Sequence, residues 1–298
     1  MDRKPLIQRK TGISYKTEEK TVLRGFDVRE LANAGYTFID GLYILFQGRI
    51  PAENERAMLD YEVAEFLEHS MSPSAAAAIG VMNGHPMLPA AVGASIATFG
   101  GAHGPGAQHG YMMKKYLDRA VLEHKTVEQV AVECVDEYMD AGRAVMGMGQ
   151  PQHLDGDPRA EPTHLKQEEI GVVGVYLKFQ RALEKRFYAR RFAEGRSYVA
   201  VNMIGAGNTA LSDMGFSPNA AWTIGCVTRG YSCSCHALFT LKKGRAWGAS
   251  RNEPMVQMLD LSMIKYIGPE DREVPLQSER EAYAMNELKT GEFKKWVI

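Results

Sequence analysis

Helical periodicity dominates this chain, and runs in which β-branched residues alternate with polar ones are scarce. Apolar side chains recur at three- and four-residue steps over residues 55 to 69 and again over residues 126 to 148, where Thr126 is a candidate N-cap. The pattern predicts further helices over residues 165 to 194 and from Ser217-Pro218 to Val227. The fold class expected from this pattern is nearly all-α.

Few segments of the sequence have the pattern of a β-strand. The best candidates are residues 21 to 23 and a short stretch in the first dozen residues, which would form at most a small sheet. A chain of 298 residues can bury a large core, as one big domain or as a large and a small domain that share a cleft.

Composition restricts the class of partner. The chain has 35 basic and 36 acidic residues and a net charge of -1, so no global field attracts it to nucleic acid or to an anionic membrane. No apolar run approaches the roughly 20 residues of a membrane helix, and the start lacks a signal-peptide core, so a cytoplasmic location is expected. The four cysteines are too few and too unevenly spaced for a disulfide framework, and we expect reduced thiols.

A glycine-rich segment around His103 is the first that suggests chemistry. It reads Phe-Gly-Gly-Ala-His-Gly-Pro-Gly-Ala-Gln over residues 99 to 108. Glycines let the backbone approach a ligand closely, and His103 is the strong polar group at the centre. The alternative is a turn histidine that bonds nearby carbonyls.

A second segment begins with Gly147-Met148-Gly149-Gln150 and continues through His153 to Asp157-Pro158-Arg159. A tight glycine turn, a polar cluster and a fixed arginine are typical of a site for an anionic ligand. Arginine binds carboxylates through paired, charge-assisted hydrogen bonds.

These segments closely resemble motifs of the citrate synthase superfamily. The first is similar to Gly-Pro-Leu-His-Gly-Gly-Ala-Asn, and the second to Gly-Phe-Gly-His with a later Asp-Pro-Arg. The resemblance implies that His103 hydrogen-bonds the thioester oxygen of acetyl-CoA, that Gly147 and Gly149 form part of the coenzyme A thioester site, and that Arg159 holds a substrate carboxylate.

Two catalytic positions of the family are substituted. Gln150 stands where the family has a histidine, and an amide has no proton to give at neutral pH. Ile204 stands where relatives carry an aspartate base. His153 could replace the missing histidine or be an ordinary feature of the turn, and Asp213, the nearest acid, is read as a surface or capping residue.

Further resemblances extend over most of the chain. His69, Arg229 and Arg251 match positions at which relatives contact the acid substrate, and the resemblance implies that Arg251 reaches a partner subunit's site. The length and the Lys265–Pro269 ending look most like citryl-CoA lyase and the corresponding part of ATP-citrate lyase. The resemblance implies a homodimer or higher homo-oligomer with a large helical domain, residues 1–102 and 205–298, and a smaller inserted helical domain, residues 103–204.

The leading functional hypothesis is therefore an enzyme that forms or cleaves a citryl-CoA-like adduct of an acyl-CoA and a keto acid. Two alternatives stay open: a non-catalytic paralogue that binds acyl-CoA or a carboxylate, and a thioester or β-diketone hydrolase. No metal is expected, because a Cys-x-Cys-His run on a helix, as at Cys233 to His236, points neighbouring side chains to different faces.

Overall fold

A computed structural model describes residues 10–84, 87–150, 153, 156–242 and 274–290. Its described part is helical apart from three short strands and connecting turns, which confirms the all-α prediction. The α-helices are α1 Val28–Asn33, α2 Phe38–Gln47, α3 Glu53–Phe66, α4 Pro73–Gly84, α5 Leu88–Ala97, α6 Gly106–Leu122, α7 Val127–Asp140, α8 Ala160–Ile170, α9 Val175–Ala193, α10 Met203–Asp213, α11 Pro218–Lys242 and α12 Arg280–Thr290, which follows the 3₁₀ turn η3 Gln277–Glu279.

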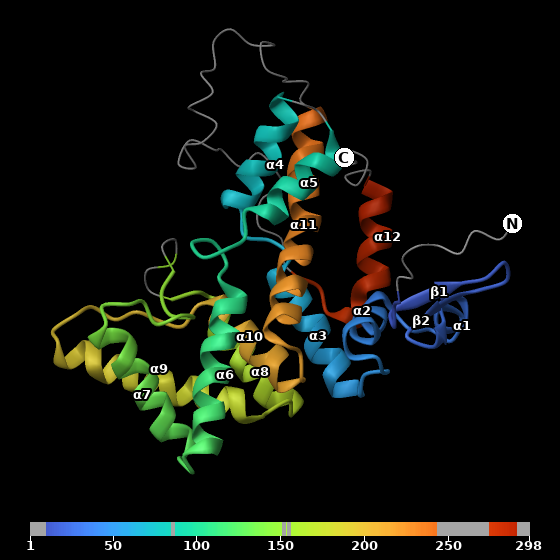
Figure 1. Cartoon of the computed structure of the whole chain (residues 1–298). Helices are drawn as coiled ribbons and strands as arrows, with labels where there is room; N and C mark the ends of the chain where they lie inside the picture. The colour runs from blue at the N-terminus through green and yellow to red at the C-terminus, as the bar shows by residue number, and fades with distance from the viewer. Residues whose placement is uncertain (1–9, 85–86, 151–152, 154–155, 243–273, 291–298) are drawn as a thin grey trace, which may run out of the picture. The chain divides into compact units, whose positions relative to one another are not determined.

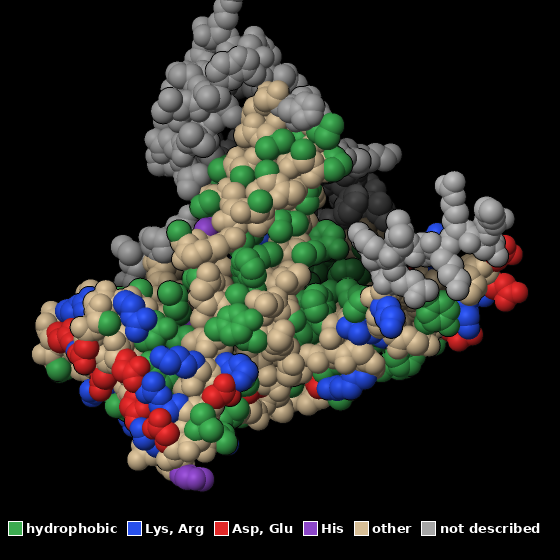
Figure 2. All heavy atoms as spheres, viewed as in Figure 1, with side chains coloured by type: hydrophobic (Ala, Val, Ile, Leu, Met, Phe, Trp, Pro, Cys, Tyr) green, Lys and Arg blue, Asp and Glu red, His purple; other side chains and the backbone are tan. Residues whose placement is uncertain are grey.

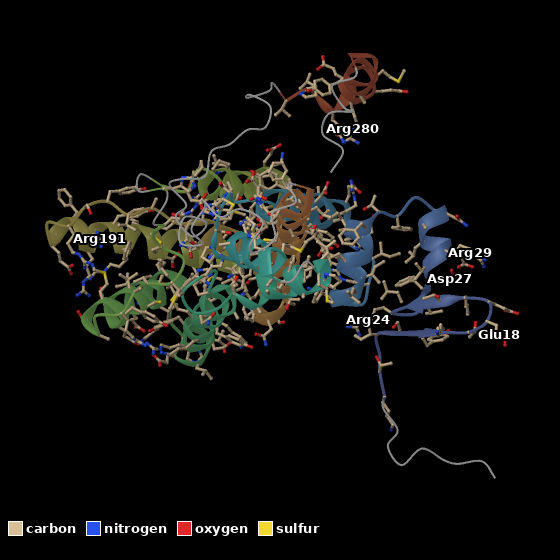
Figure 3. All side chains as sticks on the ribbon, turned by 90° about the horizontal axis from the view of Figure 1, so that it is seen from above. Glu18, Arg24, Asp27, Arg29, Arg191 and Arg280 are labelled. Carbon is tan, nitrogen blue, oxygen red and sulfur yellow. The ribbon has the colours of Figure 1, made fainter. Side chains whose placement is uncertain are left out.

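The sheet is small and antiparallel, in the order β1 Ser14–Lys16, β2 Thr21–Leu23 and β3 Phe26–Asp27. The prediction of a strand at residues 21 to 23 is confirmed. The sequence predicts the other strand in the first dozen residues, but β1, which pairs with β2, begins only at Ser14. Residues 10 to 12 are not in a strand. Figure 3 shows Arg24 and Asp27 beside this sheet. Asp27 caps α1 by accepting hydrogen bonds from the N–H groups of Arg29 and Glu30.

The predicted helices have different ends in the structure: the one predicted over residues 55 to 69 is Glu53–Phe66, and the one predicted from Ser217-Pro218 to Val227 continues to Lys242. The helix predicted over residues 126 to 148 is capped by Thr126 as expected, but it ends at Asp140. The reason is Gly142, whose φ of +65° leaves the helical region. The stretch predicted as one helix over residues 165 to 194 forms α8 and α9, because Gly171 takes φ +79° at the C-cap of α8.

The described helices divide between two compact units. Unit 1 comprises Met1–Glu68 and Phe99–Thr228, and unit 2 comprises His69–Thr98 and Arg229–Ile298. The predicted small domain, residues 103–204, lies wholly within unit 1, and the division into a large and a small domain stays a prediction.

Unit 1 has two main hydrophobic clusters. One joins α6, α7 and α9, and Figure 1 shows α7 and α9 side by side. The other joins α2, α3, α10 and the start of α11 around Tyr43, Leu59 and Leu211. In unit 2, α4 and α5 pack together with α11 through small side chains such as Ala78, Ala91 and Ala237.

Charges of both signs share the surface of α6 and α7. Figure 2 shows acidic and basic side chains interspersed there. Lys114 pairs with Asp118 on α6, and Arg119 pairs with Glu133 of α7. No helix in the described part of the chain has the length and apolar character needed to cross a bilayer.

Candidate active site

The turn at Gly147–Gly149 is held by the segment that leads into α10. The N–H of Gly149 donates to the carbonyl of Ala200 at 2.8 Å, and the N–H of Asn202 donates to the carbonyl of Gly147 at 2.9 Å. Asn202 Nδ2 adds a bond to the carbonyl of Gly149 at 2.6 Å. Asn202 also caps α10, accepting from the N–H of Gly205 at 3.0 Å. One asparagine therefore fixes both the turn and the start of the helix.

Close packing explains why residue 147 is glycine. Its φ is +83°, in the left-handed region that favours glycine. A Cβ at this position would lie 2.8 Å from Cδ2 and Nε2 of His109 and 3.0 Å from the Cα of Gly205. The turn therefore rests directly on α6 and α10, and a side chain at residue 147 would push it away from both.

His109 of α6 supports the turn and is fully buried. Its Nε2 lies 3.2 Å from Oε1 of Gln180, and its Nδ1 lies 3.4 Å from Nδ2 of Asn208. Because an amide oxygen only accepts and an amide nitrogen only donates, the proton is assigned to Nε2. Burial lowers the pKa of His109 to about 4, so its imidazole is neutral at pH 7. We regard His109 as a positioning residue.

The His103 segment is anchored to α10 and α11. The carbonyl of Gly106 accepts a hydrogen bond from Nδ2 of Asn208 at 2.7 Å, and the carbonyl of Gly104 accepts from Nε1 of Trp222 at 3.1 Å. His103 is half-buried and stacks on Phe99 with ring centroids 4.7 Å apart. The imidazole therefore stands in a bend whose backbone is tied to α10 and α11.

Arg159 forms a fork with Asp157. Nε and Nη2 of Arg159 each lie 2.9 Å from a different oxygen of the buried Asp157 carboxylate, which also accepts from the N–H of Met203 at 3.2 Å. Burial alone would raise the pKa of Asp157, but the hydrogen bonds and charge of Arg159 outweigh it and the pKa is lowered. Nη1 donates to the carbonyl of Glu65 at 3.3 Å. With respect to the described residues, these bonds use three of the five guanidinium donors.

The substituted positions lie in this same region of unit 1. Gln150 follows the glycine turn, and its Oε1 accepts a hydrogen bond from the N–H of His153 at 3.2 Å. Ile204 is half-buried in the first turn of α10, between Asn202 and Gly205. The Gly147–Arg159 and Ile204 segments thus meet at the N-terminal turn of α10, and the His103 segment is bonded to Asn208 in the next turn of the same helix.

The remaining predicted substrate contacts belong elsewhere in the chain. His69 is half-buried at the start of unit 2, and Arg229 is buried in α11 where unit 2 resumes. Arg251 lies outside the described residues. The roles of these three residues stay predictions.

Asp213 is a capping residue. Its carboxylate accepts hydrogen bonds from the N–H groups of Gly174, Tyr176 and Leu177 at 2.9 to 3.0 Å, and from Nε2 of Gln167 at 2.9 Å. It therefore holds the N-terminus of α9. Of the two roles that the sequence suggested, capping is confirmed, and the residue is half-buried.

One group of metal-ligand type occurs in the described part of the chain. Glu161 and His164 of α8 and Glu184 of α9 bring one ligand atom each within 4.8 Å of one another. Arg181 already makes two hydrogen bonds with Glu161, at 2.7 and 2.9 Å, and lies 3.7 Å from Glu184. The guanidinium of Arg181 therefore already occupies the charge-pairing position beside these carboxylates. On α11, Cys233 is buried and Cys235 is exposed, as expected for two residues on different helix faces.

Sequence reasoning missed four residues on which this region depends, namely His109, Asn202, Asn208 and Glu62. Asn202 and Asn208 act through hydrogen bonds to backbone carbonyls that are remote in sequence, and no local pattern reveals such partners. Glu62 had a visible signal, since it interrupts the apolar stripe of Met58, Leu59 and Phe66 at helical spacing.

Comparison with solved structures identifies the fold. Citryl-CoA lyase from Hydrogenobacter thermophilus matches with a TM-score of 0.70 and 24% identity over 91% of this chain and 99% of that chain. ATP citrate lyase from Methanosaeta concilii, solved in complex with (3S)-citryl-CoA, matches with a TM-score of 0.66 and 16% identity over 94% of this chain and 44% of its own. Citrate synthase from Thermoplasma acidophilum, solved with carboxymethyl coenzyme A and oxaloacetate, matches with a TM-score of 0.58 and 17% identity over 82% of this chain and 60% of that chain.

The chain therefore has the all-α fold of the citrate synthase-like proteins, and the resemblance found in the sequence is confirmed at the level of the fold. No protein-family model matches the sequence, and the comparison with curated proteins gives no match.

Proposed function

We propose that this protein is an acyl-CoA-dependent carbon–carbon bond enzyme that cleaves or forms a citryl-CoA-like adduct. The observation that carries the proposal is the convergence of the three segments on α10: the Gly147–Arg159 and Ile204 segments meet at its first turn, and the His103 segment is bonded to Asn208 in the next turn. The fold supports the substrate class, because it extends over 99% of a citryl-CoA lyase chain.

His103 is the proposed donor to the thioester oxygen. Carbon–carbon cleavage beside a thioester puts negative charge on that oxygen, and a prearranged donor lowers the barrier most where the charge develops. The stacking of His103 on Phe99 and the anchoring of the Gly104 and Gly106 carbonyls keep the imidazole in one orientation. Preorganisation of this kind costs nothing during the reaction. The glycines at 147 and 149 would let the thioester approach the backbone closely.

Arg159 is the proposed clamp for a substrate carboxylate. Its fork with Asp157 fixes the guanidinium plane, and two N–H donors remain beyond those used by described residues. Two donors in one plane match the two oxygens of a carboxylate. Arg229, His69 and Arg251 are proposed as further contacts to the acid, and the protein is proposed to act as a homodimer or higher homo-oligomer.

The substitutions at Gln150 and Ile204 favour cleavage over acetyl-CoA condensation. Condensation begins with removal of an α-proton from acetyl-CoA, and an aliphatic side chain at residue 204 cannot remove it. Retro-cleavage of a preformed adduct, or decarboxylation of a malonyl-type thioester, generates the enolate without that step. Gln150 can still donate a hydrogen bond to the carbonyl of the acid.

The same two substitutions favour one alternative, a binding protein without turnover. Gln150 accepts a hydrogen bond from its own loop, as a structural residue would. In that case acyl-CoA or a carboxylic acid would bind tightly while every thioester stayed intact. A third outcome, release of free coenzyme A without cleavage of a carbon–carbon bond, would identify a hydrolase.

A panel of thioesters tests the proposal. Purified protein is incubated at neutral pH with (3S)-citryl-CoA, malonyl-CoA and acetyl-CoA, and the products are separated by mass spectrometry. We expect processing of an adduct or malonyl-type thioester together with slow exchange of the acetyl-CoA α-protons in D₂O. Rapid deuterium uptake at neutral pH would contradict the assigned role of Ile204, and tight binding without any turnover would favour the binding protein.

A further inference from the structure

Glu62 of α3 is a buried carboxyl group with no hydrogen bond to any described residue. Its relative exposure is 0%, and with respect to the described residues neither carboxyl oxygen has a hydrogen-bond partner. Buried polar atoms are nearly always paired, because leaving one unpaired costs free energy. A carboxyl in this state therefore requires an explanation.

The carboxyl lies directly against the bare backbone of α10. A Cβ on Gly207 would lie 2.7 Å from Oε2 of Glu62 and 2.5 Å from Cε2 of Phe66. The space that a side chain at residue 207 would occupy is therefore filled by the Glu62 carboxyl and the ring. Glycine at residue 207 allows an acid from another helix to reach the α10 surface.

This contact is one helical turn from Ile204. Residues three apart share a helix face, and side chains on a helix lean toward its N-terminus, so the space over Gly207 extends toward Ile204. The same turn of α3 also contacts the proposed carboxylate clamp, because Nη1 of Arg159 donates to the carbonyl of Glu65. Glu62 therefore lies one turn of α3 from the residue that contacts Arg159, and against a residue of α10 one turn from Ile204.

We propose that Glu62 is the proton donor to the enolate carbon during cleavage of a citryl-CoA-like thioester. This inference rests on the proposed function. In the step, the bond between the hydroxyl-bearing carbon and the thioester α-carbon breaks, and its electron pair forms the enolate. The hydroxyl proton leaves to solvent and a keto group forms. The Glu62 carboxyl then gives its proton to the enolate carbon and recovers one from solvent, so one proton is lost from oxygen and one is gained at carbon.

The protonation state suits a donor at neutral pH. Burial, and to a smaller extent the charge of Glu65, raises the pKa of Glu62 to about 8. Glu65 is the ionisable group whose charge acts on Glu62. The other ionisable residues of α3 and of the elements beside it are Glu53, Glu55, Arg56, Asp60 and Tyr61 on α3, Asp40 and Tyr43 on α2, Arg159 before α8, Glu161, His164, Lys166, Glu168 and Glu169 on α8, Asp213 on α10 and Cys226 in the part of α11 that belongs to unit 1. An acid that is already protonated at pH 7 can donate its proton without first taking one up.

Two reactions of the wild-type protein should respond to pH in opposite directions. Cleavage of (3S)-citryl-CoA needs protonated Glu62, and its rate should fall about tenfold between pH 7 and pH 9 for a group of this pKa. Exchange of acetyl-CoA α-protons with D₂O needs the carboxylate, and should rise about tenfold over the same range. A mostly protonated Glu62 at pH 7 is consistent with the slow exchange of acetyl-CoA α-protons that we expect at neutral pH.

Glu62→Gln preserves size but removes the acid. We expect cleavage to slow by about 100-fold, as is typical for loss of a general acid, and both pH responses to disappear. Calorimetric binding of coenzyme A should be unchanged. The matched control is Glu184→Gln, since Glu184 is a second buried carboxyl with a pKa raised by burial, to about 7, but it contacts Gln180 of its own helix. It should retain both pH responses.

The outcomes separate the two proposals. If the wild-type protein is active and Glu62→Gln cleaves at an undiminished rate, the role of Glu62 is refuted and the proposed function stands. If Glu62→Gln does not fold, the wild-type profiles decide, and rates independent of pH between 7 and 9 refute the role. If the wild-type protein processes no thioester at any pH, the proposed function fails and this inference fails with it.

Discussion

Gly147 lies against His109 so closely that a Cβ on residue 147 would be 2.8 Å from two ring atoms. This contact joins the glycine turn to α6, and through Asn208 the same histidine is joined to α10. The geometry of the candidate site therefore depends on a buried neutral imidazole as well as on the residues that would meet a substrate.

Gly147→Ala should disrupt this arrangement. Alanine at positive φ costs about 1 to 2 kcal/mol, and the contact with His109 adds a steric cost, so we expect a loss of more than about 3 kcal/mol in the free energy of unfolding. Gly142→Ala is the matched control, because Gly142 has φ +65° with no atom within 4 Å of its would-be Cβ. Gly142→Ala should lose only the free energy that alanine costs at positive φ, about 1 to 2 kcal/mol. Equal losses in urea unfolding would contradict the packing argument.

Asp213→Ala should destabilise unit 1 by about 2 to 3 kcal/mol, because it leaves the N-terminus of α9 without its buried acceptor. Asp118→Ala serves for comparison: its pair with Lys114 is exposed, and the loss should stay below about 1 kcal/mol. Urea unfolding of both variants measures the difference. Similar values would show that Asp213 is not the cap on which α9 depends.

Acid should destabilise the protein through its buried histidines. Burial lowers the pKa of His109 and of His164 to about 4. Between pH 6.5 and 4 the unfolded state binds more protons than the folded state at these positions, so their contribution to stability falls as the pH falls. Each contributes a slope of up to about 1.4 kcal/mol per pH unit.

His164→Phe isolates this effect, because neither ring nitrogen of His164 has a hydrogen-bond partner among the described residues. The stability of the variant relative to the wild-type protein should increase steadily as the pH falls from 6.5 to 4. Taking the difference also removes the opposite contribution of Glu62, whose pKa is raised by burial. A constant difference across that range would show that His164 is not held neutral.

Arg159→Lys should weaken binding of the acid substrate. Lysine cannot form the planar two-donor contact, and loss of one charge-assisted hydrogen bond corresponds to about tenfold or more in affinity. Calorimetry with oxaloacetate or citrate measures the change. Arg181→Lys is the control, because that arginine pairs with Glu161 on the surface, and its affinity for the acid should match that of the wild-type protein.

The sequence was sufficient for the helical class, the small sheet and the segments of the candidate site, since periodicity and glycine-rich motifs are local signals. Helix ends depended on single backbone conformations, such as the left-handed Gly171 that separates α8 from α9. The contacts of Asn202, Asn208 and His109 join residues far apart in the chain. Spacing carries no information about such contacts, which is why the supporting residues emerged only from the structure.

Cleavage of ¹³C-labelled (3S)-citryl-CoA, followed by NMR at neutral pH, tests the central proposal most directly. We predict that acetyl-CoA and oxaloacetate appear in equal amounts with the wild-type protein, and that His103→Ala is slower by about 100-fold or more, because it lacks the donor to the thioester oxygen. Intact thioester, release of citrate with free coenzyme A, or an undiminished rate in His103→Ala would contradict the proposal.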